Sequence, residues 1–179
     1  MIMNPLALKQ NNETNKNDWC TPPWLFKRLH EIFNFDIDGA SDGINNLLPN
    51  YHTSETPYDV KVNNSQQFNI FVNPPFNEDV LQFFNSSCKF TCLLLPFRPE
   101  TRKWHDYIWP KATIFVFNKR IQYIHPEKKI EVKGAAFPSC LVLFGDLSTF
   151  PIDKLNDLGV FVKKFNALNK EDNHDICYF

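Results

Sequence analysis

Residues 68–76 read F-N-I-F-V-N-P-P-F, and this segment carries the strongest indication of how the chain folds. The first five residues combine apolar and β-favouring side chains, so we expect a strand over residues 68–72. The strand must end at the prolines, because Pro74 and Pro75 have no N–H group and bias the residue before them away from helical angles. The segment therefore predicts a buried strand that delivers a rigid turn to the carboxyl edge of a sheet, where open α/β sheets bind ligands.

Patterns typical of strands and helices alternate on both sides of this segment. Thr21-Pro22-Pro23 predicts a helix start with Thr21 as the N-cap, and an apolar face follows at helical spacing: Leu25, Phe26, Leu29, Ile32 and Phe33. Residues 39–67 are polar and predict mainly loop or short helix. We expect further helices over residues 78–86 and 101–109, and strands over 34–38, 90–95, 113–117, 120–124, 139–144 and 159–163. This alternation predicts an α/β sheet with a mainly parallel core.

Length and composition indicate one globular domain. The chain has 179 residues, of which 43% are apolar, enough for one hydrophobic core. Residues 1–17 are polar and predict a mobile tail, which leaves residues 18–179 as a single domain. The formal net charge is −1, so a nucleic-acid partner would have to be held by a local basic patch rather than by overall charge.

Composition also argues against several classes of protein. No apolar run is long enough to cross a membrane, and the polar N-terminus does not read as a signal peptide, so we expect a cytoplasmic protein. The five cysteines form no C-x-x-C pair and the five histidines show no metal-ligand spacing, so we expect neither disulfides nor a metal site. Eighteen phenylalanines beside five glycines predict a core of large rings and disfavour a glycine-rich phosphate loop.

The polar groups of Asn73-Pro74-Pro75-Phe76 suit the planar amino group of a nucleobase. The lone pair of that group is delocalised into the ring, so the nitrogen is a poor nucleophile. The Asn73 side-chain oxygen and the Pro74 carbonyl could hold its two N–H groups and favour the positive charge that develops on nitrogen as a methyl group arrives. Phe76 could stack on the base, a contact worth roughly 1–3 kcal/mol. A base in duplex DNA would have to rotate out of the helix to reach this loop.

Several short motifs resemble, in their order and spacing, those of the phage-type DNA N-6-adenine-methyltransferase family. They are D-W-C-T-P-P at 18–23, F-D-I-D at 35–38, F-V-N-P-P-F at 71–76, L-L-P-F-R-P-E-T at 94–101, Lys119-Arg120-Ile121 and G-A-A-F-P-S-C-L-V-L-F-G at 134–145. The resemblance implies an abridged Rossmann-like methyltransferase sheet with flanking helices, S-adenosylmethionine as cofactor and adenine N6 in double-stranded DNA as substrate. It also implies a catalytic loop of Asn73, Pro74, Pro75 and Phe76, at work in the cytoplasm of a bacterium or of a phage-infected host.

The same resemblance implies where the cofactor binds. Trp19, Thr21 and Pro22 match a motif that lies against the methionine part of the cofactor in related enzymes, and Asn73 would border the same pocket. Asp38 ends the first core strand, where such enzymes line the cofactor pocket. The usual loop of an acid followed by G-x-G is missing, since G-A-S-D-G follows Asp38. Either the cofactor half of the sheet is abridged, or Asp38 is the ribose-binding acid and Asp59 faces the adenine of the cofactor.

Basic residues near the expected carboxyl edge are candidates for holding DNA. They are Arg98, Arg102, Lys103, Lys119 and Arg120. Contacts between these side chains and phosphates would make DNA binding sensitive to salt. Three further lysines lie near the H-P-E-K-K-I-E-V-K segment, where a solvated surface is the simpler interpretation: Lys128, Lys129 and Lys133.

Other functions are compatible with the same motifs. N-P-P-Tyr/Phe loops also serve enzymes that methylate protein glutamine, and adenine in RNA is a further candidate substrate. The missing glycine loop would also suit a catalytically inactive nucleic-acid-binding module of the same fold. The chain leaves no separate segment for target recognition, so we expect a short or relaxed target sequence.

Overall fold

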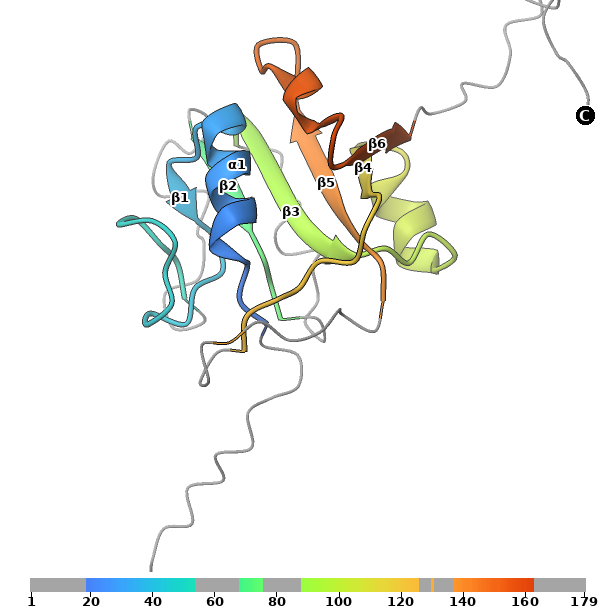
Figure 1. Ribbon diagram of the computed structural model, residues 1–179. Coiled ribbons are helices and arrows are strands. Elements are labelled where there is room, and N and C mark those ends of the chain that lie inside the picture. The colour runs from blue at the N-terminus through green and yellow to red at the C-terminus, as the bar shows by residue number, and fades with distance from the viewer. Residues whose placement is uncertain (1–18, 54–67, 76–87, 126–129, 131–136, 163–179) are drawn as a thin grey trace, which may run out of the picture.

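Six strands form one mixed sheet in the order β1-β2-β3-β5-β4-β6 (Figure 1). This arrangement is that of a computed structural model, which describes residues 19–53, 68–75, 88–125, 130 and 137–162. The strands are β1 (Ile37–Asp38), β2 (Asn69–Val72), β3 (Phe90–Pro96), β4 (Thr113–Phe117), β5 (Ser139–Gly145) and β6 (Gly159–Val162). The strands expected around 68–72, 90–95, 113–117, 139–144 and 159–163 are confirmed, whereas only Ile37–Asp38 of the segment 34–38 is a strand.

Strand direction differs from the expected mainly parallel core, and that prediction is wrong. β1, β2 and β3 are parallel neighbours. β5 runs antiparallel to both β3 and β4, and β6 runs antiparallel to β4. Both faces of the central strands are covered, so each strand is a continuous apolar run whichever way its neighbour points, and the sequence pattern does not distinguish the two directions.

The helix expected after Thr21-Pro22-Pro23 is α1 (Pro23–Phe33), and its five predicted apolar residues are all buried. Its N-cap, however, is Pro22 and not Thr21. Pro22 has extended angles, φ −59° and ψ 135°, and its carbonyl accepts the N–H groups of Leu25 and Phe26. The helix therefore begins one residue later than predicted, and the Thr21 side chain is not used for capping.

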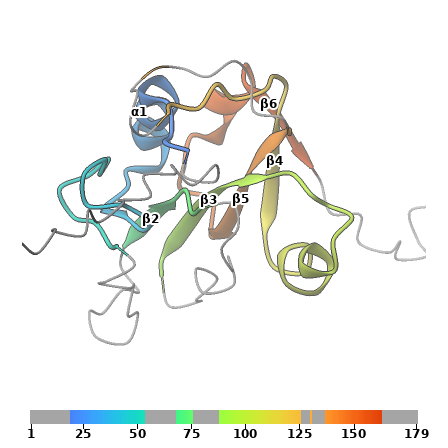
Figure 2. The ribbon, with the colours of Figure 1, turned by 90° about the horizontal axis from the view of Figure 1, so that it is seen from below.

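Helical segments cover both faces of the sheet (Figure 2). On one face α1 and the 3-10 turn η4 (Ile152–Leu155) pack over the rings of Phe71, Phe90 and Phe115. On the other face the π-helical turn η3 (Trp104–Ile108) packs over Ile70, Leu93 and other aliphatic side chains. Residues of one strand alternate between these faces with period two. The first core confirms the expected use of large rings, with the Phe33 and Phe90 centroids 4.8 Å apart.

Other expectations have mixed outcomes. The segment 101–109 is helical over Trp104–Ile108, as a π-helical turn. Residues 120–124 are not a strand of the sheet: Ile121 and Tyr123 alternate inward as in a strand, but the segment forms a single antiparallel bridge, Cys20 to Ile124. Residues 39–53 are loop, as predicted, and the helix expected at 78–86 lies outside the described residues.

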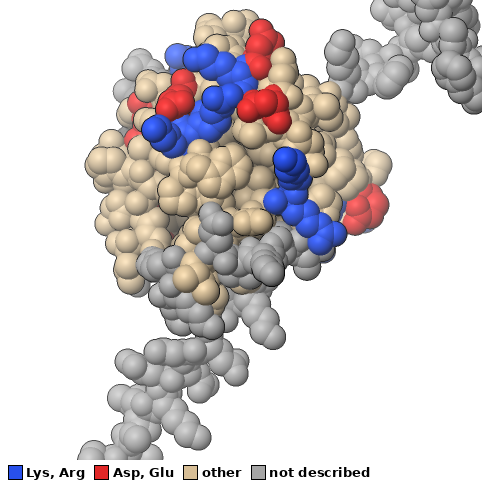
Figure 3. All heavy atoms as spheres, viewed as in Figure 1, with Lys and Arg blue, Asp and Glu red and all other residues tan. Residues whose placement is uncertain are grey.

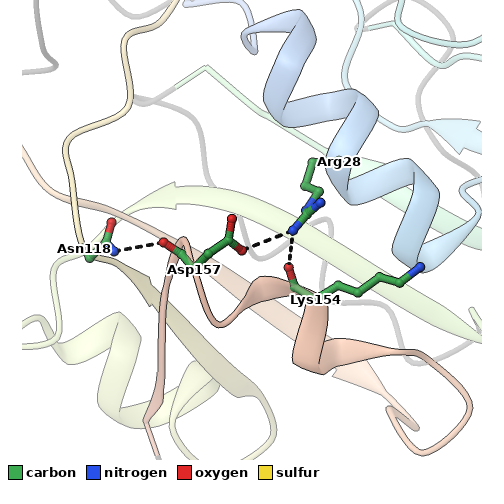
Figure 4. A network of polar contacts seen from close by, with 4 residues as sticks. All are labelled: Arg28, Asn118, Lys154 and Asp157. Atoms are coloured by element: carbon green, nitrogen blue, oxygen red, sulfur yellow. Dashed lines mark hydrogen bonds and ion pairs between the residues drawn. The ribbon is translucent and has the colours of Figure 1, made fainter.

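Two sets of polar contacts fix α1 to the rest of the fold. Near its C-terminus the Asn69 amide donates to the carbonyls of Phe33 and Asn34. On its outer side Arg28 donates to the Lys154 carbonyl at 2.8 Å and pairs with Asp157 at 3.2 Å (Figure 4). These contacts fix α1 to the first residue of β2 and to the segment 154–157.

Candidate active site

The carboxyl edge of the sheet collects most of the predicted site residues. Asp38 ends β1, and Asn73 directly follows β2. Arg98 lies two residues beyond β3, and Lys119 lies two residues beyond β4. β3 and β4 run in the same direction because both are antiparallel to β5. In Figure 1 the chain before α1, the end of β2 and the chain after β4 converge at this edge. The strand order therefore brings together segments from four parts of the sequence.

The Asn73 side chain is held in one orientation. Its Nδ2 donates to the Trp19 carbonyl at 2.7 Å, which assigns the amide because only the nitrogen can donate. Its Oδ1 is buried and has no hydrogen-bond donor among the described residues. A buried acceptor without a partner costs about 1–3 kcal/mol. The strand therefore ends on a fixed, unsatisfied acceptor, as a site for an amino group requires.

Thr21 provides a second buried polar atom without a partner in the described part of the chain. The residue is 3% exposed, and its Oγ1 has no hydrogen-bond partner there. Thr21 lies two residues after Trp19, whose carbonyl binds Asn73. The unsatisfied hydroxyl and the unsatisfied amide oxygen thus belong to two segments that the Asn73–Trp19 hydrogen bond joins.

Asp38 organises the loop that follows β1. Its carboxylate accepts the N–H of Leu47 at 2.9 Å and that of Ala40 at 3.4 Å. Burial raises the pKa of this carboxyl, and the nearby Asp42 raises it a little further, although the two amides and, to a smaller extent, His52 lower it. Asp38 therefore closes the loop 39–47 upon itself, a role that the sequence did not predict.

Gly39 lets the chain after β1 lie close against β2. Its N–H donates to the Phe71 carbonyl at 2.7 Å. A Cβ at this position would lie 2.9 Å from Val72 Cγ2 and 3.1 Å from Ile70 Cγ2. The backbone after β1 thus lies directly against β2, just before the Asn73 turn. The signal in the sequence was a glycine next to the acid that ends the strand.

The sequence is similar to those of known DNA methyltransferases. The profile of the DNA N-6-adenine-methyltransferase (Dam) family matches residues 9–175. The chain belongs to this family. A DNA N-6-adenine-methyltransferase of Haemophilus phage HP1 is 29% identical over 150 residues, which cover 78% of this chain and 85% of the phage protein. The chain is thus an adenine-specific DNA methyltransferase, as its motifs predicted.

Basic side chains of the methyltransferase lie beside the same edge. Arg98, Lys119 and Arg120 are exposed. Arg102 is exposed as well, but it pairs with Asp106 of η3 at 3.2 Å. Figure 3 shows Lys and Arg side chains over α1 and, separately, over the chain that follows β4. The second group is next to the carboxyl edge of the sheet.

Sequence reasoning missed several residues of the methyltransferase's carboxyl edge. Tyr123 and Ser139 are buried there and share a hydrogen bond of 2.9 Å. The His125 ring lies edge-on to Trp19 at 5.8 Å. The signal for Tyr123 was the inward alternation with Ile121, and for Ser139 its place at the start of β5.

Some predicted residues fall outside the described part of the chain: Phe76, Asp59, Lys128, Lys129 and Lys133. Within the described residues, no group of three His, Cys, Asp or Glu side chains could hold a metal ion. No helix in that part is both long and apolar enough to cross a membrane.

Proposed function

We propose that the methyltransferase methylates N6 of an adenine that has rotated out of double-stranded DNA, with S-adenosylmethionine as methyl donor and Asn73-Pro74-Pro75-Phe76 as the loop that holds the amino group. The observation that carries this proposal is the Asn73 amide. Its Nδ2 donates a hydrogen bond to the Trp19 carbonyl, while its buried Oδ1 has no donor among the described residues. Such an acceptor is complementary to an N–H donor of the substrate.

The loop acts on the amino group by accepting hydrogen bonds. Asn73 Oδ1 accepts one N–H and the Pro74 carbonyl accepts the other, and both partial negative charges favour the positive charge that develops on nitrogen during transfer. The Trp19–Asn73 hydrogen bond keeps the amide from turning its NH2 group towards the substrate. Phe76 stacks on the base. Because Asn73 is half-buried at the sheet edge, the adenine must leave the duplex to reach it.

The residues at the carboxyl edge fit the cofactor. S-adenosylmethionine, when bound, supplies a methyl group activated by its sulfonium. Thr21 Oγ1 is a buried hydroxyl without a described partner, so it is the polar group that we assign to the cofactor, with Trp19, Pro22 and Asn73 beside it. The Pro22 carbonyl is used by the first turn of α1, so Pro22 contributes only its ring.

Asp38 has an indirect role in the same proposal. Its carboxylate holds the loop 39–47, and we assign that loop to the cofactor side of the sheet. Asp59 remains our candidate for the adenine of the cofactor. The sheet, with its parallel β1, β2 and β3 and few helices, is an abridged Rossmann-like methyltransferase sheet in this proposal.

DNA is held by the basic residues beside the edge. We assign phosphate contacts to Arg98, Lys119 and Arg120, and a weaker contact to Arg102 because Asp106 competes for its guanidinium. Phosphate contacts fix the position of the duplex without reading its sequence.

One assay tests the proposal. The protein is incubated with S-adenosylmethionine and unmethylated duplex DNA, and the nucleosides are then analysed by mass spectrometry for N6-methyladenine. We expect methylation by the wild-type chain and a loss of about 100-fold or more with Asn73→Ala, the size found when one oriented acceptor or donor is removed from a transition state. Wild-type activity of that variant would show that the loop is misassigned.

A further inference from the structure

We infer that Tyr123 is a positioning residue that fixes the orientation of the Asn73 amide through the peptide group between residues 19 and 20. The inference rests on the role proposed for Asn73. It concerns the segment Ile121–His125, here called the edge strap, which follows β4 in the sequence and crosses the carboxyl edge of the sheet towards the chain before α1 (Figure 1).

The edge strap is anchored in the interior by two side chains. Ile121 is 3% exposed and Tyr123 is 2% exposed. The Tyr123 hydroxyl lies 2.9 Å from Ser139 Oγ, and Ser139, at 1% exposure, begins β5 opposite Pro96 of β3. A hydrogen bond between two groups shielded from water is stronger than an exposed one, and losing one partner leaves the other unsatisfied. Tyr123 therefore fixes the strap to the start of β5.

The residue after Tyr123 holds the chain before α1. Ile124 and Cys20 exchange two backbone hydrogen bonds of 3.0 Å each. The Trp19 ring also lies edge-on to His125 of the strap, with 5.8 Å between the ring centroids. The two backbone hydrogen bonds and the aromatic contact together fix Trp19 and Cys20 relative to the strap.

One peptide group connects the strap to the catalytic amide. The Cys20 N–H and the Trp19 carbonyl belong to the same planar unit, which points them in opposite directions. The N–H donates to Ile124 of the strap, and the carbonyl accepts from Asn73 Nδ2 at 2.7 Å. A shift of the strap therefore tilts this peptide and moves the acceptor that orients Asn73. The geometry connects Ser139, Tyr123, Ile124, the 19–20 peptide and Asn73 in one continuous path.

Tyr123→Phe tests this path, because it removes the hydroxyl and keeps the ring. We expect kcat to fall about tenfold, because small displacements of a reacting group are costly, while KM for DNA changes less than about twofold. Tyr107→Phe is the matched control, since Tyr107 is on η3, exposed, and away from the strap. That control should keep the wild-type kcat.

A second readout reports on Asn73 without turnover. The side-chain NH2 signals of Asn73 in a nitrogen–proton correlation spectrum are assigned by their disappearance in Asn73→Ala. Tyr123→Phe should shift or broaden these signals and speed the hydrogen exchange of the Cys20 amide, whereas Tyr107→Phe should leave both unchanged.

A double variant separates positioning from stability. Tyr123→Phe leaves Ser139 buried without its partner, so Tyr123→Phe with Ser139→Ala should recover part of any lost melting temperature. The path is still broken, so kcat should stay low. Recovery of kcat together with stability would show that Tyr123 acts on folding alone and would overturn the inference.

The inference and the proposed function fail in different ways. Wild-type kcat and unchanged Asn73 signals in Tyr123→Phe, with Asn73→Ala inactive, would overturn the positioning role and leave the catalytic loop in place. Full activity of Asn73→Ala would overturn the proposed role of Asn73 instead, and the spectra would still show whether Tyr123 fixes that amide.

Discussion

Asn69 and Asn73 flank β2 at its two ends with the same arrangement: each donates from Nδ2 to a backbone carbonyl and has a buried Oδ1 with no donor among the described residues. Asn69 opens the strand and binds two carbonyls at the end of α1, so its role is structural. Asn73 follows the strand at the edge where α/β sheets bind ligands. In the proposed function, the position in the sheet, and not the local geometry, distinguishes the structural Asn69 from the catalytic Asn73.

The two asparagines should therefore separate stability from activity. Asn69→Ala leaves the carbonyls of Phe33 and Asn34 without their donor, so the free energy of unfolding should fall by about 1–3 kcal/mol while kcat stays at the wild-type value. Asn73→Ala should abolish methylation with a smaller loss of stability, since it removes one hydrogen bond. Urea unfolding measures the free energy of unfolding, and nucleoside analysis measures methylation. Equal loss of activity in the two folded variants would contradict the assignment.

Thr21→Val should reduce the affinity for S-adenosylmethionine without reducing the stability of the fold. Valine keeps the shape of threonine and removes a hydroxyl that is buried without a described partner, so stability should stay the same or rise by about 1 kcal/mol. Affinity for S-adenosylmethionine should fall about five- to tenfold if that hydroxyl binds it, which corresponds to one hydrogen bond of about 1 kcal/mol. Titration calorimetry without DNA gives the affinity. Unchanged binding would remove Thr21 from the cofactor site.

Asp38→Asn should change how stability depends on pH. Burial raises the folded-state pKa of Asp38 above its ordinary value of 3.8, so the folded protein binds this proton more tightly than the unfolded chain does. The contribution of Asp38 is then most favourable below the ordinary value and declines as pH rises through the raised pKa. The unfolding free energy of wild type minus that of Asp38→Asn should thus decrease as pH rises above the ordinary pKa of 3.8. A difference that grows with pH would mean that the Leu47 and Ala40 amides outweigh burial.

DNA binding should depend on salt through the residues beside the carboxyl edge. Arg98→Ala or Lys119→Ala should each reduce the slope of log Kd against log salt concentration by about one, because each removes one phosphate contact. Lys89→Ala is the matched control, since Lys89 is exposed and precedes β3 at the opposite edge. Binding to a labelled duplex at several salt concentrations gives the slopes. Equal slopes for all three variants and the wild type would place the DNA elsewhere.

The apolar pattern predicted α1 and the strands β2 to β6 because local burial leaves a direct trace in the sequence. It did not predict the direction of β5, because a strand covered on both faces is apolar whatever its neighbours do. It misread 120–124 as a strand, because Ile121 and Tyr123 alternate inward while crossing the edge of the sheet.

By itself, the sequence determined that a buried strand ends in Asn73-Pro74-Pro75, since prolines without N–H groups end a strand and leave a side-chain amide at its tip. The family of the chain follows from the order of such motifs. Only the tertiary structure decided which way that amide faces, because its partner, the Trp19 carbonyl, is 54 residues away in the sequence. It also decided that the buried Thr21 hydroxyl has no partner among the described residues and that Asp38 closes its own loop. Hydrogen bonds between distant segments depend on where the sheet brings them together, and no local pattern records them.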